Sequence, residues 1–292
     1  MAFRSVIVEN PCKCTYKGGY MVIRKEDDTA MVHLSEINSV VLETNQAFLS
    51  AYLLSELAKA KISLVISDER HNPVGQFLPL YGAHNTSKKV LEQIDWSEPA
   101  KKRVWQRVVR DKILHQADIL AARVEEGWAK RLQELAAEVR SGDVTNREGA
   151  AARLYFQTLF GQGFSRDQDT PLNACLNYGY AILLSMVNRE IVARGYMTQL
   201  GICHRNEYNQ FNLGCDLMEP FRPIVDRLVH DNFDGELDRD MKRVLADMPN
   251  NSLHYREGSY RVSSVISSYV NDCLNALGKR LTVNEIQYFE VV

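Results

Sequence analysis

Short apolar runs separated by polar turn residues fill the first 80 positions of the chain, and helical periodicity replaces them afterwards. These runs have the length and β-branched character of strands. They lie at 5–8, 20–23, 30–34, 40–42 and 62–66. One stretch, 45–60, instead repeats its leucines at helical spacing. We therefore expect residues 1–80 to form a small β-rich domain that carries one helix.

The segment 81–95 is polar and contains turn-forming residues, so we expect it to be a linker. Helical periodicity follows over 97–140, 172–194 and 212–230, the last strained by Pro220 and Pro223. Residues 96–292 are therefore predicted to form a larger, all-α domain. The predicted fold class is α+β, with a β-rich N-terminal domain and a helical C-terminal one.

The composition is that of a water-soluble protein: of 292 residues, 45% are hydrophobic and 25% charged. No run approaches the roughly 18 apolar residues of a membrane helix, and the first residues lack a secretory signal. We expect a cytoplasmic protein without membrane contact. The six cysteines are scattered without a CxxC pair, which favours reduced thiols.

Positive charge is local, because the whole chain has a formal net charge of -2. Residues 96–140 carry ten basic and seven acidic groups, whereas the segments on either side are net acidic. Within this stretch Asp111 is the only acid among a group of basic residues: Lys101, Lys102, Arg103, Arg107, Arg110 and Lys112. Arg103, Arg107 and Arg110 share a helix face. Contact with DNA phosphates and an ordinary solvated surface are equally compatible with this pattern.

Glu148 lies in the first turn of a predicted helix. On spacing alone, Thr145-x-x-Glu148 is best read as a capping box, in which the glutamate only bonds the helix start. A second group of polar residues begins at His204, which follows a glycine-containing turn, and continues with Asp216 and Glu219 on one face of a predicted helix. Apolar neighbours indicate that at least one of these carboxylates is buried and needs a partner, either an arginine such as Arg222 or a cation.

Carboxylate, imidazole and carboxylate together make an oxygen and nitrogen donor set that suits Mg²⁺ or Mn²⁺. A cation held in this way supports phosphodiester chemistry. The spacing of these residues does not by itself establish such a site. The sequence has no GxxxxGK loop, no GxSxG elbow and no HExxH motif, which argues against the enzyme classes that use them.

Five segments of the chain resemble the CRISPR-associated integrase of spacer acquisition, in the form found in type II systems. They are HLSEINSVVLETNQAFLS, FLPLYGAHN, REGAAARLYFQTLFG, LNACLNYGYAILLSMVNREIVARG and DLMEPFRPIVDRLV. The resemblance spans the chain. It implies that Glu148, His204 and Glu219 are catalytic residues and metal ligands, with Asp216 as a possible additional acid. It thereby overrides the capping-box interpretation of Glu148.

The resemblance also implies a reaction and a set of partners. The 3'-hydroxyl ends of captured double-stranded DNA are joined to the CRISPR repeat by a metal-dependent transesterification with Mg²⁺ or Mn²⁺. Homodimers formed through the β-rich domain flank a dimer of the small second adaptation protein in a heterohexamer, and other type II adaptation proteins can join them. Two alternatives are kept: a metal-dependent nuclease that acts on branched DNA in repair, and a non-catalytic DNA-binding scaffold.

Overall fold

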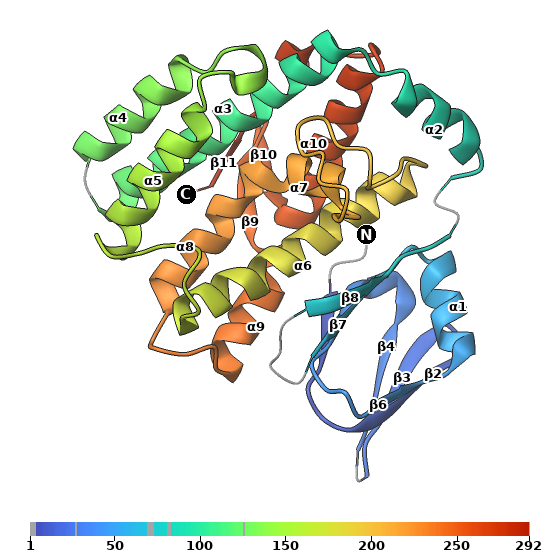
Figure 1. Ribbon diagram of the computed structural model, residues 1–292. Helices are drawn as coiled ribbons and strands as arrows, with labels where there is room; N and C mark the ends of the chain where they lie inside the picture. Colours follow the sequence, from blue (N-terminus) through green and yellow to red (C-terminus); the bar gives the residue numbers. More distant parts are fainter. Residues whose placement is uncertain (1–3, 27, 69–72, 81–82, 125, 292) are drawn as a thin grey trace.

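The structure is a computed structural model that describes residues 4–26, 28–68, 73–80, 83–124 and 126–291. Within these residues the N-terminal part contains two four-stranded sheets and helix α1 (Ala51–Lys59). It is drawn in blue in Figure 1, below the helices of the C-terminal part. Helix α1 packs against the sheets through Leu53 and Leu57, which are completely buried.

The first sheet has the order β1-β5-β7-β8, and the last of its strands is antiparallel to its neighbour. Its strands are β1 (Arg4–Val8), β5 (Ile37–Leu42), β7 (Ser63–Ser67) and β8 (Pro73–Phe77). The second sheet has the order β4-β3-β2-β6 and is antiparallel except for the pairing of β6 with β2. Its strands are β2 (Cys12–Lys17), β3 (Tyr20–Arg24), β4 (Thr29–His33) and β6 (Ala47–Leu49). A short 3-10 turn, Leu34–Glu36, joins β4 to β5.

The first sheet is buried on both faces, and strand β5 shows why. Val40 and Leu42 point into the core that the two sheets and α1 share. Val41, which lies between them and points the other way, belongs to the core of the helical part. The two-residue repeat of a strand thus joins the N-terminal part to the helices through apolar contacts.

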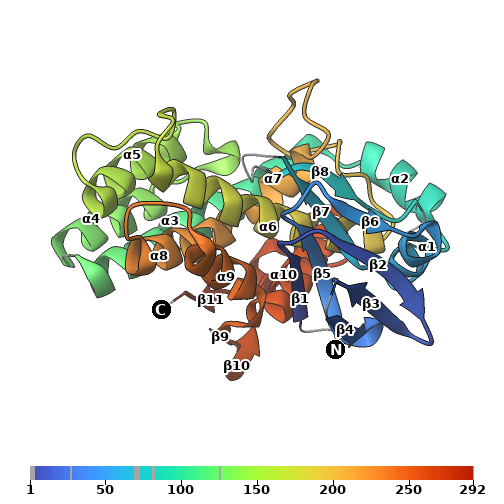
Figure 2. The same cartoon turned by 90° about the horizontal axis from the view of Figure 1, so that it is seen from below.

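Helices dominate the C-terminal part. They are α2 (Thr86–Ile94), α3 (Glu98–Arg123), α4 (Glu126–Ala137), α5 (Arg147–Phe160), α6 (Pro171–Ala193), α7 (Asn212–Met218), α8 (Arg222–Asn232), α9 (Arg239–Asp247) and α10 (Val262–Leu277). Helix α6 is buried on most of its circumference, as expected for a central helix. It contacts α7, α8, α9 and α10 as well as strand β7. Figure 2 shows the same molecule from below, with α3, α4 and α5 on the side away from the sheets.

The predicted α+β fold class is confirmed, with corrections to individual elements. The helix expected over 97–140 is a pair, α3 and α4, because the backbone leaves helical angles at Val124. The helix expected over 212–230 is also divided: a 3-10 turn, Glu219–Phe221, separates α7 from α8. Prolines cause the second break, since Pro220 and Pro223 are the second residues of the 3-10 turn and of α8.

Further expectations were wrong in detail. The C-terminal part is not all-α, because β9 (Ser252–Tyr255), β10 (Gly258–Arg261) and β11 (Phe289–Glu290) form a small antiparallel sheet. The predicted linker 81–95 contains helix α2, and its first two positions, 81–82, lie outside the described residues. Besides β9, β10 and β11, three strands of the described N-terminal part were missed: β2, β6 and β8. Strand β6 lies within the stretch 45–60 that was expected to be helical, so the helix begins only at Ala51. The domain boundaries themselves stay a prediction.

Candidate active site

Glu148 lies in the first turn of α5, and other residues cap that helix. Asn146 is the N-cap in a left-handed conformation (φ 49°), and its side chain accepts the Gly149 amide at 3.2 Å. The Asp143 carboxylate accepts the amides of Arg147 at 2.9 Å and of Glu148 at 3.0 Å. The capping-box interpretation of Thr145 and Glu148 is therefore wrong, because the N-cap lies one residue later and the Glu148 side chain points elsewhere.

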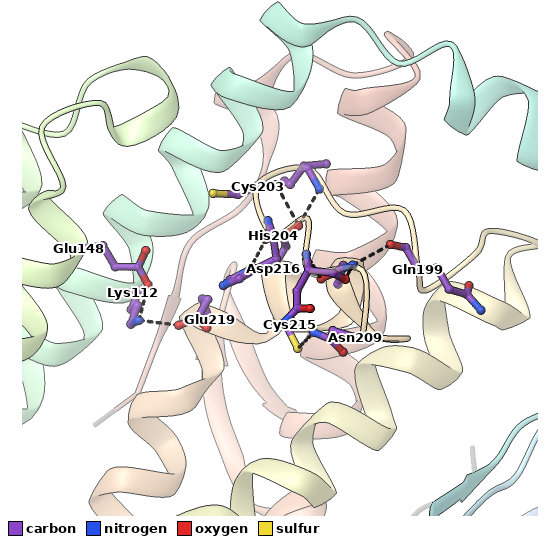
Figure 3. A network of polar contacts seen from close by, with 12 residues as sticks. Lys112, Glu148, Gln199, Cys203, His204, Asn209, Cys215, Asp216 and Glu219 are labelled. Carbon is purple, nitrogen blue, oxygen red and sulfur yellow. Dashed lines mark hydrogen bonds and ion pairs between the residues drawn. The ribbon is translucent and has the colours of Figure 1, made fainter. Parts of the chain in front are cut away.

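The Glu148 side chain instead meets Lys112, a residue of α3. Their Oε1 and Nζ atoms are 2.7 Å apart. Glu219 approaches the same ammonium from the 3-10 turn between α7 and α8, with Oε2 at 2.5 Å from Nζ. Two carboxylates from distant parts of the chain thus converge on one positive charge, as Figure 3 shows.

Glu219 is almost fully buried, at 3% exposure, and two cations compensate its charge. Besides Lys112 it has Arg222, whose Nε lies 2.9 Å from Oε1. Burial alone would raise the pKa of Glu219, but Arg222 and Lys112 outweigh burial and hold the pKa below its usual value. The carboxylate is therefore ionised at neutral pH although it is buried.

His204 is fixed by Asp216. Its Nδ1 lies 2.6 Å from Asp216 Oδ1. The same carboxylate accepts three backbone amides of the loop, from Ile202, Cys203 and His204, at 2.6, 3.1 and 3.1 Å. The loop closes so tightly that a Cβ on Gly201 would lie 2.4 Å from the His204 carbonyl oxygen, so only glycine fits there.

This geometry gives different roles to Asp216 and Glu219, the two acids between which the sequence did not decide the metal ligand. Asp216 is completely buried, and both of its oxygens accept hydrogen bonds from the His204 loop. It supports the histidine and has no open side for a metal. With Nδ1 bonded to Asp216, the Nε2 atom of His204 is left as the free ring nitrogen, on a side chain that is 44% exposed. The hydrogen bond to Asp216 raises the pKa of His204 in spite of partial burial.

The donor set fits a divalent cation, although the side chains are not yet in a metal-binding arrangement. Among the described residues, no three His, Cys, Asp or Glu side chains are grouped closely enough to hold a metal ion. However, Glu219 Oε2 is buried and receives no hydrogen bond of good geometry, even from Lys112. The charges of Glu219 and Glu148 also contribute to the raised pKa of His204, so the three side chains lie within electrostatic range of one another, and Figure 3 draws them in one region of the fold.

The basic face of α3 is less available to DNA than the sequence suggested. Arg107 is engaged inside the protein, because its Nε lies 2.8 Å from both Asp111 carboxylate oxygens, and its contact with a phosphate stays a prediction. Lys101 pairs with Glu98 at 3.2 Å and is mostly covered. Three of the predicted residues are exposed at the surface: Lys102, Arg103 and Arg110.

Lys112 is the residue of this site that sequence analysis did not single out. It was counted only as one of the basic residues of its helix. A local signal existed, since Lys112 lies one helical turn from Val108 and Val109, both completely buried. A lysine on the buried side of a helix requires a partner with negative charge.

Comparisons with known proteins identify the family of the chain. The family model described as CRISPR associated protein Cas1 matches residues 6–240. A CRISPR-associated endonuclease Cas1 of Neisseria meningitidis serogroup C (strain 8013) is 36% identical to the chain, over 98% of the chain and 97% of that protein.

Two solved structures share the fold. A casposase bound to its integration product has a TM-score of 0.77 at 17% identity, over 99% of this chain and 95% of that one. A Cas6-RT-Cas1--Cas2 complex has a TM-score of 0.76 at 19% identity, and the match covers 99% of this chain but 36% of that longer one. In the described parts of the chain, no helix is both long and apolar enough to cross a membrane. The family model and the Neisseria relative each cover most of the chain, and the protein therefore belongs to the CRISPR-associated Cas1 family.

Proposed function

We propose that this protein is a metal-dependent DNA integrase with endonuclease activity that acts in CRISPR spacer acquisition. One observation carries the proposal: Glu148 and Glu219 converge on a single cation position beside the imidazole of His204. The Neisseria relative is named an endonuclease, and the casposase of the same fold was captured with an integration product.

When bound, Mg²⁺ or Mn²⁺ would offset the negative charge that develops on the reacting phosphate. Glu148 and Glu219 are positioned to hold it through carboxylate oxygens and His204 through Nε2. Asp216 keeps the His204 ring in orientation by accepting a hydrogen bond from its Nδ1–H group. Arg222 holds the other oxygen of Glu219, so that Oε2 points toward the site.

The proposed reaction is a direct exchange of phosphodiester bonds. The 3'-oxygen of a captured DNA end forms a bond to a phosphorus at the edge of the CRISPR repeat, and the bond from that phosphorus to the 3'-oxygen of the repeat strand breaks. The attacking hydroxyl loses one proton and the leaving oxygen gains one. One phosphodiester bond forms for each one that breaks, so no ATP is required. Partial exposure of Glu148 and His204 leaves these two side chains accessible to DNA.

The partners are part of the same proposal. Lys102, Arg103 and Arg110 are exposed along α3 and suit contacts with DNA phosphates, and Lys101 lies beside them. A partnership with the small adaptation protein Cas2 is supported by the Cas6-RT-Cas1--Cas2 complex, one chain of which contains this fold. Homodimers through the β-rich domain and a heterohexamer with Cas2 belong to the proposal as predictions. A cytoplasmic location and the type II assignment also stay predictions.

An integration assay tests the proposal. The purified protein, with and without Cas2, is given a DNA fragment with free 3'-hydroxyl ends and a plasmid carrying a CRISPR repeat, with Mg²⁺, Mn²⁺ or EDTA. We expect joined product that requires metal and is lost in the Glu148→Ala, His204→Ala and Glu219→Ala variants. Cleavage of branched DNA without joining, with Cas2 present, would support the nuclease alternative. DNA processing that is unchanged in all three variants would support the non-catalytic scaffold.

A further inference from the structure

A lysine lies between the two carboxylates of the candidate metal site. Lys112 Nζ lies 2.7 Å from Glu148 Oε1 and 2.5 Å from Glu219 Oε2, and the Lys112 residue is 8% exposed. Lysine is rarely buried unless it is paired. Here burial opposes its charge, but the carboxylates of Glu219 and Glu148 outweigh burial and raise the pKa of Lys112. The ammonium is therefore charged at neutral pH.

The position of this ammonium determines where the two carboxylates point. Glu148 lies in the first turn of α5 and Glu219 in the 3-10 turn after α7, and both carboxylates form an ion pair with α3 at Lys112. Both carboxylates lie within 2.7 Å of the same nitrogen atom. Without a cation between them, their negative charges would repel each other, in partly buried surroundings where solvent screens them poorly. Arg222 is on the other side of Glu219 and shows no ion pair with Glu148.

We propose that Lys112 is a positioning residue that acts as an internal counter-ion. It holds Glu148 and Glu219 toward one point while the site is free of metal, and it leaves that point when a divalent cation enters. This inference rests on the proposed metal-dependent function. A metal bound by both carboxylates and the ammonium cannot occupy the same place, because both require the same oxygens and because their positive charges repel.

The proposal predicts two opposite effects of removing the lysine charge. In Lys112→Met the metal-free protein loses its counter-ion and becomes less stable. The metal, in contrast, no longer has to displace a bound cation, and it meets two uncompensated carboxylates. We expect Mn²⁺ to bind on the order of tenfold more tightly, since one unit charge a few ångströms away is worth at least that factor. A lysine with a purely structural role would lower stability without increasing metal affinity.

The experiment measures Mn²⁺ binding at pH 8 by the loss of the free Mn²⁺ signal in electron paramagnetic resonance, and thermal unfolding with and without Mn²⁺. The full-length proteins are the wild type, Lys112→Met, Glu148→Gln and the double variant. Lys130→Met, which changes an exposed lysine of α4, is the matched control and should behave like the wild type. If the apolar side chain prevents folding, Lys112→Gln is measured in the same way with the same expectation.

Support requires a lower unfolding temperature without metal, a larger increase on adding Mn²⁺, and tighter binding in the Lys112 variant. In the Glu148→Gln background, the Lys112 substitution should increase Mn²⁺ affinity by less, because one of the two carboxylates that pair with Lys112 is already neutral. If the wild type binds Mn²⁺ through Glu148 but Lys112→Met binds it equally or more weakly, the counter-ion role is refuted and the proposed function stands. If the wild type binds no Mn²⁺ and integrates DNA in EDTA, the counter-ion role of Lys112 and the proposed metal-dependent function are refuted together.

Discussion

Asp216 Oδ1 lies 2.6 Å from His204 Nδ1, and the same carboxylate accepts the His204 backbone amide at 3.1 Å. One buried acid therefore fixes both the ring and the main chain of the histidine. Arrangements in which a carboxylate orients a ligating imidazole are common at metal sites and contribute to metal affinity. Asp216, which the sequence analysis named as a possible additional acid of the site, has this supporting role.

Changing Asp216 to Asn should uncouple His204 from its support. The hydrogen bond to the carboxylate is the main reason that the pKa of His204 is raised, so the pKa should fall toward its ordinary value in the variant. Integration should fall on the order of 10- to 100-fold. Nuclear magnetic resonance titration of the His204 ring and the integration assay measure the two effects. An unchanged His204 pKa together with full activity would show that Asp216 has no such role.

The start of α5 offers a second test, because Asp143 accepts the first amides of the helix and Thr145, which the capping box required, does not. Asp143→Ala removes acceptors from the Arg147 and Glu148 amides and should cost about 1–2 kcal/mol of stability. It should also reduce integration, since Glu148 loses its fixed position. Thr145→Ala is the control and should stay within about 0.5 kcal/mol of the wild type. Chemical denaturation checks both, and a larger loss in Thr145→Ala would restore the capping box.

The arginines of α3 should divide into two groups. Replacing Arg103 and Arg110 by Ala should weaken DNA binding alike for all sequences and flatten its salt dependence, because each lost phosphate contact removes about one released counter-ion. Arg107→Ala should instead cost about 3 kcal/mol of stability, since it leaves the buried Asp111 carboxylate without its ion pair. Fluorescence anisotropy over a range of salt concentrations and thermal unfolding separate these outcomes. An unchanged salt slope for the Arg103 and Arg110 variants would make them ordinary surface residues.

Asp226 should make the stability of the protein depend on pH. Burial raises its pKa from 3.8 to about 6, although the Tyr180 hydroxyl donates a hydrogen bond to it and Arg222 lies nearby. Between these two values the folded chain binds the proton more tightly than the unfolded chain, so the free energy of unfolding falls as pH rises and stays low above pH 6.

Asp226→Asn removes this ionisation. The variant should therefore be more stable than the wild type at pH 7.5, by about 1–3 kcal/mol, and its advantage should shrink as the pH is lowered from 6 to 4. Denaturant unfolding at a series of pH values measures the difference. An advantage that does not change with pH would mean that Asp226 titrates in the folded protein as it does in the unfolded one.

Local patterns in the sequence were sufficient for much of the fold. An apolar run such as 40–42 and helical spacing in a stretch such as 172–194 reflect which sides of an element are buried, and burial is a local property of an element once it packs. The strands at 12–17 and 73–77 were missed because they carry few consecutive apolar residues, and the second begins with proline. Pairing with neighbouring strands defines them.

The sequence by itself also determined the residue types of the site and, through family resemblance, drew attention to Glu148, His204 and Glu219. Only the tertiary structure decided how these residues relate to their neighbours. Asp216 turned out to be bonded on both oxygens, and Lys112 lies between two carboxylates that are 36 and 107 positions away in the chain. The physical reason is that periodicity records whether a side chain is buried, whereas its partner depends on how α3 packs against α5 and the turn after α7.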